Sequence, residues 1–299
     1  NLKYAMAQPI TKIETNGAIT YFFKKLKDIP AEFAFDSSIK VLKPSTNVAL
    51  TIKTNNGEKI QIVLLDEQTA LTCWKGNWAG QERVFLSKGS LIYDHNMLSV
   101  EDNISDFDVS VYPVPSNVSY NDDVVKSTKN GIFSCFHIST GLPVASNVTL
   151  TKTQEAGPLR TITMGIAKAA EEPMDEDFNN AAIWTLKRPE PALANQRALL
   201  TIHYKGDVAR LYANNHFLDD NFYNGRPFLY DLNRLSSNVK ELSLKILPLQ
   251  KGAPIYIQKE FQFDMGGQPS MIKDVNAQII YLNKIELKVM APKNIDRKS

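Results

Sequence analysis

Apolar and polar residues alternate one for one along most of this chain. The runs VALTIK (48–53) and KIQIVLL (59–65) show this period of two, and so do TKIET (11–15) and AITYFF (18–23). Alternation of this kind is typical of half-buried β-strands, and such runs recur as far as QIIYLNKIELKVM (278–290) at the spacing expected of sandwiches. Helical signals are short and limited to 66–74 and 175–184. The pattern predicts an all-β chain.

Paired turn residues join several of these runs. Asn16-Gly17 and Asn56-Gly57 each separate two alternating segments, which is a strong signal for a β-hairpin. Asn214-Asn215 predicts a third hairpin, because Asn accepts the positive φ that such a turn needs. Opposite residues around that turn must sum to 429, which predicts these pairs: Ala213 with His216, Tyr212 with Phe217, Leu211 with Leu218, and Arg210 with Asp219.

The predicted strands fall into two groups. Residues 114–130 carry prolines, serines and asparagines with few apolar positions, which is typical of a linker. The sequence therefore predicts two antiparallel β-sandwich modules, 1–113 and 131–299, joined by the linker 114–130. The final apolar run, 278–290, is expected to pair within the second module, since it needs cover on at least one face.

Charge and cysteine content exclude several functions. The net charge is +2 without a basic block, so neither a nucleic-acid partner nor a membrane partner is expected. Cys73 and Cys135 are too few for a disulfide framework and fall in different predicted modules, so each is interpreted as a small buried apolar residue. His95, His137, His203 and His216 show no metal-ligand spacing, and the sequence predicts no metal site and no cofactor.

Two segments are candidates for carbohydrate binding. The loop DNFYNGRPF (220–228) offers amides, a guanidinium and an aromatic ring, which suit sugar hydroxyls and a sugar face. The segment TCWKGNWAGQE (72–82) offers two tryptophans. The alternative for both segments is packing, the loop against a neighbouring domain and the tryptophans in a sandwich core. The predicted binding residues are Asn221, Tyr223, Asn224, Arg226, Trp74 and Trp78.

No catalytic residues are predicted. A glycosidase needs two carboxyl groups facing one cleft, about 5–9.5 Å apart. Asp219 and Asp220 are neighbours on a strand, so their side chains should point to opposite faces. The acidic run at 171–177 is interpreted as a solvated loop, and no nucleophile elbow or phosphate-binding glycine loop occurs.

The segment GDVARLYANNHFLDDNFYNG (206–225) resembles a signature of the C-terminal β-sandwich region of bacterial family 35 glycoside hydrolases, the β-galactosidase family. Three weaker likenesses follow the same family order, at 2–35, where AMAQP stands in place of an expected ATAQP, at 60–87 and at 183–204. The resemblance implies a jelly-roll, galactose-binding-like second module. It also implies a periplasmic or secreted location.

That family is expected to carry its two catalytic glutamates on a (β/α)₈ barrel. This chain has no alternation of strands with long helices, so the resemblance covers only the non-catalytic part and the chain alone is predicted to be inactive. The implied partners are an upstream catalytic barrel of the same polypeptide and galactose-containing glycans. A free-standing carbohydrate-binding or protein-interaction module remains the alternative; the absence of an initiator Met at Asn1 favours the accessory region.

Overall fold

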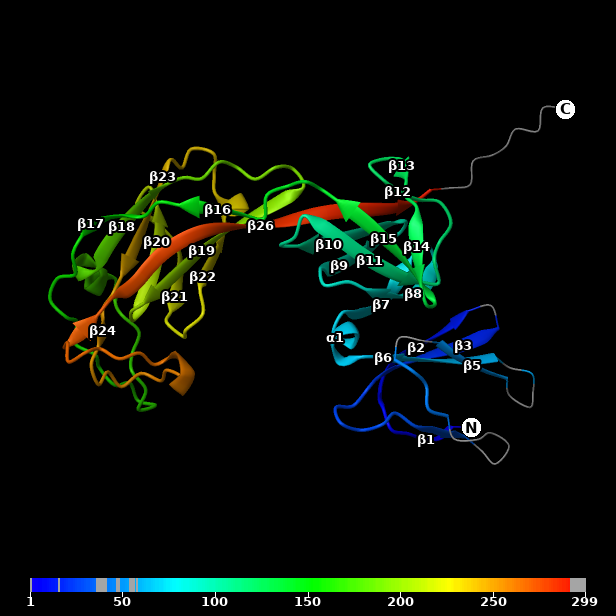
Figure 1. Cartoon of the computed structure of the whole chain (residues 1–299). Coiled ribbons are helices and arrows are strands. Elements are labelled where there is room, and N and C mark those ends of the chain that lie inside the picture. Colours follow the sequence, from blue (N-terminus) through cyan, green and yellow to red (C-terminus); the bar gives the residue numbers. More distant parts are fainter. Residues whose placement is uncertain are drawn as a thin grey trace. The chain divides into compact units, whose positions relative to one another are not determined.

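The chain forms two compact units that consist almost entirely of β-strands. The computed structural model describes residues 2–15, 17–35, 42–46, 49–53, 57 and 59–290. One unit comprises Asn1–Leu142 with Asn283–Ser299, and the other comprises Pro143–Leu282 (Figure 1). Strands far outnumber helices in both units, which confirms the all-β prediction. The described ranges contain no helix whose length and hydropathy would let it span a bilayer.

The first unit begins with a small sheet in the order β2-β3-β6-β5. Its strands β3 and β6 run parallel, which departs from the expected purely antiparallel module. Phe23, Phe33 and Leu64 are buried in its core. Asp66 caps the short helix that follows, accepting a hydrogen bond from the Thr69 amide at 2.8 Å. The elements of this part are β1 (Leu2–Ala5), β2 (Gln8–Thr15), β3 (Ala18–Lys24), β4 (Phe33–Phe35), β5 (Ala49–Lys53), β6 (Lys59–Leu65) and α1 (Glu67–Ala70).

The predicted hairpin turns of this sheet fall partly outside the described residues. Strands β2 and β3 pair from Gln8↔Lys24 to Thr15↔Ala18, so the hairpin at 16–17 is confirmed by its strands. Strands β5 and β6 also pair antiparallel, with described pairs from Ala49↔Val63 to Lys53↔Lys59. The predicted turn at 56–57 lies largely outside the described residues, and so does Asn16.

The rest of the first unit is a β-sandwich. One sheet has the order β14-β15-β11-β8-β7, and the facing strands are β13-β12-β26-β10-β9. Buried apolar residues of both sheets, including Phe85, Val109, Leu98 and Leu287, fill the space between them. The elements are β7 (Cys73–Trp78), β8 (Gln81–Leu86), β9 (Ser90–Asp94), β10 (Met97–Asp102), β11 (Asp106–Tyr112), β12 (Val118–Tyr120), β13 (Asp123–Val124), β14 (Ser127–Asn130) and β15 (Phe133–Ser139), with the last part of β26 (Lys273–Val289).

The second unit is also an antiparallel sandwich. The sheet β17-β18-β23-β20-β21 packs against β22, β19, β26 and β16 over a core that includes Trp184, Leu200, Leu211 and Leu244. Trp184 is therefore a core residue. The elements are β16 (Ala145–Val148), β17 (Thr151–Gln154), η1 (Asp175–Asn180), β18 (Ala182–Lys187), β19 (Gln196–Lys205), β20 (Val208–Ala213), β21 (His216–Phe222), β22 (Phe228–Asp231), η2 (Leu232–Arg234), β23 (Glu241–Ile246), β24 (Leu249–Gln250), η3 (Lys259–Phe261) and β25 (Ser270–Met271).

The structure divides the chain at a different place from the predicted linker. Residues 114–130 contain the strands β12, β13 and β14, which all belong to sheets of the first unit. The last strand, β26, belongs to both units, because residues 277–280 pair with β16 while residues 283–289 pair with β10 and β12. The expected pairing within the second module is therefore confirmed for residues 277–280, while residues 283–289 pair in the first unit instead. Cys73 and Cys135 likewise share one sheet of the first unit, as free thiols.

The 208–222 hairpin has the predicted turn but not the whole predicted register. Asn214 and Asn215 have φ of 49° and 64°, and Tyr212 lies opposite Phe217 with ring centroids 5.9 Å apart. One residue later the register shifts, so that Leu211 faces Asp219 rather than Leu218. Leu218 is the extra residue of a β-bulge, and the predicted pair with Leu211 is wrong. Leu211 is nevertheless buried in the core.

The shift also changes the partner predicted for Arg210. Its strand neighbour is Asp220 instead of Asp219, and its guanidinium pairs with Asp175 of η1 at 2.6 Å. The same guanidinium lies over the Phe178 ring, 4.0 Å from its centroid. The acidic side chains of the run 171–177 are exposed or, at Asp177, partly exposed, as expected, and Asp175 pairs η1 with the hairpin while remaining 90% exposed.

The observed register predicts a measurable coupling between Tyr212 and Phe217. Edge-to-face aromatic pairs contribute about 0.5–1.5 kcal/mol beyond the area they bury. A double-mutant cycle with Tyr212→Ala and Phe217→Ala, measured by urea unfolding, is expected to give a coupling energy of about this size. The control cycle pairs Leu211→Ala with Leu218→Ala. A larger coupling in the control cycle would contradict the bulge and support the unshifted register.

Candidate functional site

The segment that carries the family resemblance begins with a tight turn, Gly206-Asp207, between β19 and β20. A Cβ at Gly206 would lie 2.9 Å from Ile246 Cγ2 and 3.1 Å from the Leu247 carbonyl oxygen, so a larger residue does not fit there without a shift. The Asp207 amide donates to the same carbonyl at 2.9 Å. These two positions are therefore explained by the close approach of the turn to the end of β23.

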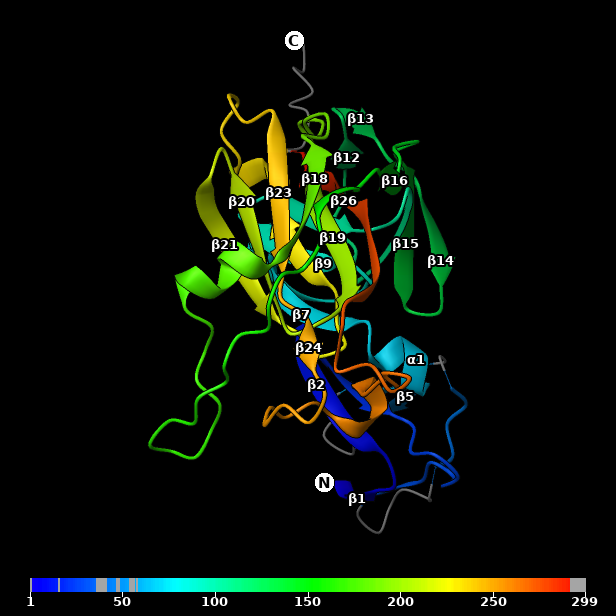
Figure 2. The ribbon, with the colours of Figure 1, turned by 90° about the vertical axis from the view of Figure 1, so that its left-hand side faces the viewer.

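Asp207 also forms a buried ion pair with Arg160. Arg160 Nη2 lies 3.1 Å from Asp207 Oδ2, and the two side chains are 6% and 7% exposed. Burial raises the pKa of the Asp207 carboxyl above its ordinary value, while the charge and hydrogen bond of Arg160 oppose that rise. Arg160 belongs to the long segment between β17 and η1, which Figure 2 shows in green, extending away from the sandwich of the second unit. The ion pair therefore fixes part of this segment to the 206–207 turn.

The loop that follows the hairpin packs against the segment 259–263 of the same unit. Tyr223 donates its hydroxyl hydrogen bond to the Phe261 carbonyl at 3.0 Å, and its ring packs edge-on against Tyr204 and Phe263 at 5.8 and 5.7 Å. Gly225 has φ +81°, and a Cβ there would lie 2.0 Å from the Phe261 ring. The aromatic and glycine positions of the loop therefore pack within the second unit itself, whereas the expected alternative to sugar binding was packing against a neighbouring domain.

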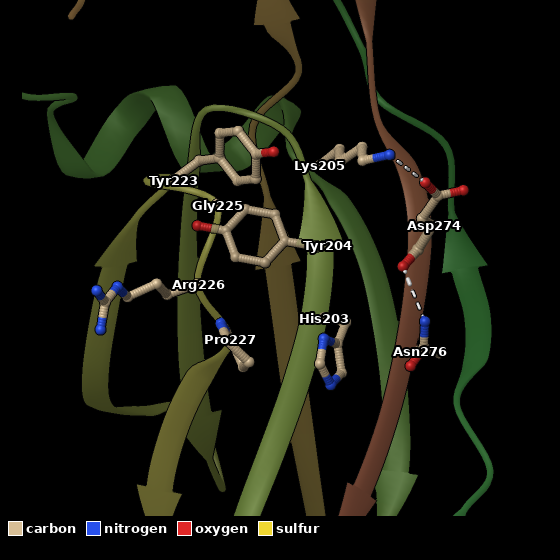
Figure 3. A pocket seen from close by; sticks show the side chains of 9 residues that line it. All are labelled: His203, Tyr204, Lys205, Tyr223, Gly225, Arg226, Pro227, Asp274 and Asn276. Atoms are coloured by element: carbon tan, nitrogen blue, oxygen red, sulfur yellow. Dashed lines mark hydrogen bonds and ion pairs between the residues drawn. The ribbon is translucent and has the colours of Figure 1, made fainter. Parts of the chain in front are cut away.

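A polar pocket of about 370 Å³ lies beside this loop. Figure 3 shows Tyr223 and Tyr204 at one wall and Lys205 with Asp274 across from them. The Lys205 ammonium lies 2.8 Å from Asp274 Oδ2. Asn276 Nδ2 donates to the Asp274 backbone carbonyl at 3.1 Å, and Asp274 has φ +57°. The lining residues are His203, Tyr204, Lys205, Tyr223, Gly225, Arg226, Pro227, Asp274 and Asn276.

Three consecutive residues at the end of β19, His203, Tyr204 and Lys205, line the pocket. In β19, Ile202 and Tyr204 are buried, whereas His203 and Lys205 are partly exposed on the opposite face. Strand β19 pairs with β26, so the start of β26, with Asp274 and Asn276, lies along the neighbouring strand. The pocket is therefore assembled from two adjacent strands and the loop at 223–227.

The charges of the pocket are fixed by the Lys205–Asp274 pair. The hydrogen bond to Asp274 raises the pKa of Lys205, and the same bond from Lys205 lowers the pKa of Asp274. Both groups are thus charged between the ordinary pKa of Asp and that of Lys, and the pair offers a sugar hydroxyl both a donor and an acceptor. Burial raises the pKa of the Tyr204 and Tyr223 hydroxyls, which remain neutral donors.

The structure brings some of the predicted binding residues together. Tyr223 and Arg226 line the pocket, and Asn221 lies behind it, where its carbonyl and side-chain oxygens accept from the Tyr204 hydroxyl at 2.7 and 2.9 Å. Asn224 accepts from the Arg226 amide at 3.0 Å within the turn. Asn224 and Arg226 also border a second hollow of about 250 Å³ with Tyr256, whose side chain is 89% exposed.

The two predicted tryptophans belong to the first unit. Trp78 is fully buried, with its indole N–H donated to the Asn96 carbonyl at 2.9 Å, so its expected binding role is wrong and the core alternative holds. Trp74 is 38% exposed and donates to the Ser87 carbonyl at 3.0 Å. Trp74 keeps an accessible surface, but it is not part of the pocket in the second unit.

Sequence reasoning missed the five pocket residues outside the predicted loop: His203, Tyr204, Lys205, Asp274 and Asn276. The alternation of β19 could have placed His203 and Lys205 on one outward face. Their proximity to Asp274 depends on the pairing of β19 with β26, about 70 residues later, which no local pattern specifies.

The pocket lacks the pair of carboxyl groups that glycoside hydrolysis requires. Among the described residues that line it, Asp274 is the sole carboxylate, and this group is engaged by Lys205. A retaining or inverting mechanism needs two facing carboxyl groups. The arrangement is therefore suited to binding polar ligands and not to general acid–base hydrolysis.

A larger hollow of about 840 Å³ lies elsewhere on the second unit. Its lining includes Asn147, Arg188, Glu190 and Glu241, from β16, the end of β18 and the start of β23. None of the predicted binding residues lines it.

Comparison with known proteins leaves the family open. No protein-family profile matches the sequence, and no curated protein matches it. Among solved structures, the chain is similar to the GH31 α-xylosidase Xac1773 from Xanthomonas citri, with 10% identity over 97% of this chain and a TM-score of 0.17. The chain spans 34% of the length of that enzyme. A superposition this weak carries no argument about fold or function.

Proposed function

We propose that this chain is an accessory β-sandwich region of a glycoside hydrolase of the β-galactosidase-like family 35, and that its second unit binds carbohydrate without cleaving it. The observation that supports this most is the position of the signature segment 206–225. Most of its distinctive residues stabilise the second unit, and its last part forms one wall of a polar pocket. A segment with these two roles fits a non-catalytic region that presents a sugar site.

The pocket has the size and polarity for a monosaccharide unit. Its volume of about 370 Å³ lies near the lower end of ligand-site volumes, roughly 300–1,000 Å³. Lys205, Asp274 and Asn276 offer donors and acceptors for ring hydroxyls, and Arg226 lies at the rim with its guanidinium directed away from these three side chains (Figure 3). The proposed ligand is a galactose-containing glycan, and the proposed partner is a catalytic barrel encoded upstream in the same polypeptide. A periplasmic or secreted location is part of the same proposal.

Replacing Arg226 tests the sugar site. Arg226→Ala is expected to weaken binding of methyl β-galactoside about tenfold, which corresponds to one charge-assisted hydrogen bond of roughly 1.5 kcal/mol. The melting temperature should not change, because no side-chain partner holds the exposed guanidinium among the described residues. Arg234→Ala, an exposed arginine outside the pocket, is the matched control. Binding is measured by isothermal titration calorimetry or by chemical-shift changes. Equal loss in both variants, or no binding by the wild type, would refute the site.

Tyr223 is a poor probe of binding, although it lines the pocket. Its ring packs against Tyr204 and Phe263, so Tyr223→Ala removes packing as well as any sugar contact. We expect it to lower the free energy of unfolding by about 2 kcal/mol or more. A loss of binding in that variant therefore has to be interpreted together with its melting temperature, because destabilisation alone would also weaken binding.

The exposed Tyr256 favours the second candidate function, a free-standing carbohydrate-binding module. Its ring lies beside Arg226 and Asn224 and is almost fully exposed, which suits it to cover a sugar face. The two functions predict different activities for the polypeptide encoded in the full reading frame: the accessory region implies that it hydrolyses glycosides, and the free-standing module implies that it does not. Cleavage of a chromogenic β-galactoside by that polypeptide, with none by the present chain, supports the accessory region. Glycan binding with no hydrolysis by either supports the free-standing module.

A further inference from the structure

Three side chains of the kinds that bind zinc meet on the first unit. One ligand atom each from Asp108, Cys135 and His137 lies within 4.8 Å of the other two. They form the one such group of His, Cys, Asp and Glu side chains found in the described residues. This group lies in a different unit from the proposed sugar pocket, and the proposed function makes no use of it.

The register of two strands brings these residues together. Cys135 and His137 are two residues apart on β15, so their side chains share one face of the sheet. Asp108 on β11 lies directly opposite His137 in the antiparallel ladder. Directly opposite residues have Cβ atoms about 4.5–5.5 Å apart, within reach of a shared ion. Ile138 and Phe136 point into the sandwich core, which holds the two strands in this register.

The donor set is that of a transition metal rather than of calcium or magnesium. Thiolate and imidazole ligands select zinc-like ions, whereas Ca²⁺ and Mg²⁺ prefer oxygen ligands alone. Zinc sites with three protein ligands keep the fourth position of the tetrahedron for water. His137 and Asp108 are 58% and 73% exposed, so water can reach that position, while Cys135 is 8% exposed.

A neighbouring hydroxyl orients the histidine for this role. His137 Nδ1 hydrogen-bonds to Asp108 Oδ1, and His137 Nε2 lies 3.2 Å from the Thr128 hydroxyl on β14. The hydrogen on Nδ1 makes the bond to Asp108 Oδ1, and a metal ion that takes the place of this hydrogen would be bound by both atoms while Nε2–H donates to Thr128. Metal-binding histidines commonly use the second ring nitrogen for such an outer hydrogen bond.

We propose that Asp108, Cys135 and His137 bind one zinc-type divalent metal ion, with His137 Nδ1 as the imidazole ligand and Thr128 as its outer partner. Three protein ligands from β11 and β15 would then join these strands on the exposed side of the sheet. Because the ion binds the folded chain, it should also raise the melting temperature.

Cobalt titration of the full chain, stripped of metal with a chelator and kept reduced, tests the site. Co²⁺ gives a thiolate-to-metal absorption band in the near ultraviolet when a cysteine binds it. We expect the band to saturate at one ion per chain, to be displaced by Zn²⁺, and to disappear in Cys135→Ser and His137→Gln. Thr128→Val should keep the band but weaken binding by about tenfold, and Asp108→Asn should weaken it further.

The first unit supplies matched controls. Cys73→Ser removes the other free thiol, and His95→Gln removes a histidine whose Nδ1 lies 2.6 Å from Asp94 Oδ1 but which has no cysteine in its group. Both should keep the band and the stabilisation by Zn²⁺. Circular dichroism confirms that each variant is folded, and Thr128→Val tests the site without changing a ligand. Absence of the band in the wild type, its persistence in Cys135→Ser, or its loss in Cys73→Ser would overturn the proposal.

Discussion

Replacing Asp207 by alanine is expected to lower the free energy of unfolding by about 3–5 kcal/mol, because it leaves Arg160 as an unpaired buried charge. The two side chains are 6% and 7% exposed, so water cannot replace the lost partner. The Arg160 backbone carbonyl also accepts from Gln250 Nε2 at 2.7 Å, which holds the arginine in place after the change. Urea unfolding monitored by circular dichroism measures the effect.

The ion pair itself is not expected to be a net source of stability. Burial raises the Asp207 pKa, and Arg160 Nε has no hydrogen-bond partner among the described residues. A buried pair with unmet hydrogen bonds can be replaced by apolar residues at little cost, so Arg160→Met with Asp207→Leu should be about 3 kcal/mol more stable than Asp207→Ala. A double variant as unstable as the single one would contradict this account.

The sign of the Asp207 shift also sets its pH dependence. A carboxyl whose folded pKa is raised favours the folded state most below its unfolded pKa, and this contribution is lost as pH rises through the folded pKa.

Glu155→Ala is the control for the removal of one negative charge by Asp207→Ala. Its pair with Lys152 is largely exposed and contributes about 0–1 kcal/mol.

Gly225→Ala is expected to destabilise the second unit by about 3 kcal/mol. A residue with a Cβ costs roughly 1–2 kcal/mol at positive φ, and overpacking against the Phe261 ring adds about 1–3 kcal/mol. The methyl group would lie 2.0 Å from that ring, so the loop 223–227 has to move. Because this loop is a wall of the polar pocket, sugar binding should weaken in the same variant.

Gly252→Ala separates the two causes. Gly252 has φ +74°, close to the +81° of Gly225, but nothing lies within 4 Å of a Cβ placed there. It should therefore show only the conformational cost of about 1–2 kcal/mol. Equal effects of the two substitutions on the melting temperature would show that contact with Phe261 contributes nothing.

The fold class and much of the local structure could be predicted from the amino-acid pattern alone. Alternation with a period of two depends only on which side chains face the core, so it identified strands such as 59–65 and 278–290 before any pairing was known. The Asn214-Asn215 turn was predictable for the same reason, since the positive φ it needs is a property of the turn residues. Pairing was correct next to that turn, at Tyr212 and Phe217, and wrong beyond the bulge at Leu218.

The way in which distant strands combine could be seen only in the folded chain. Whether residues 114–130 pair into a sheet, and whether β26 pairs with strands of one unit or of both, depends on contacts between segments far apart in sequence. The polar pocket needs β19 beside β26, and the Asp108–Cys135–His137 group needs the register of β11 on β15. The sequence of a strand predicts which of its residues share a face. It does not predict which strand lies beside it, because strand pairing is set by the packing of the whole core.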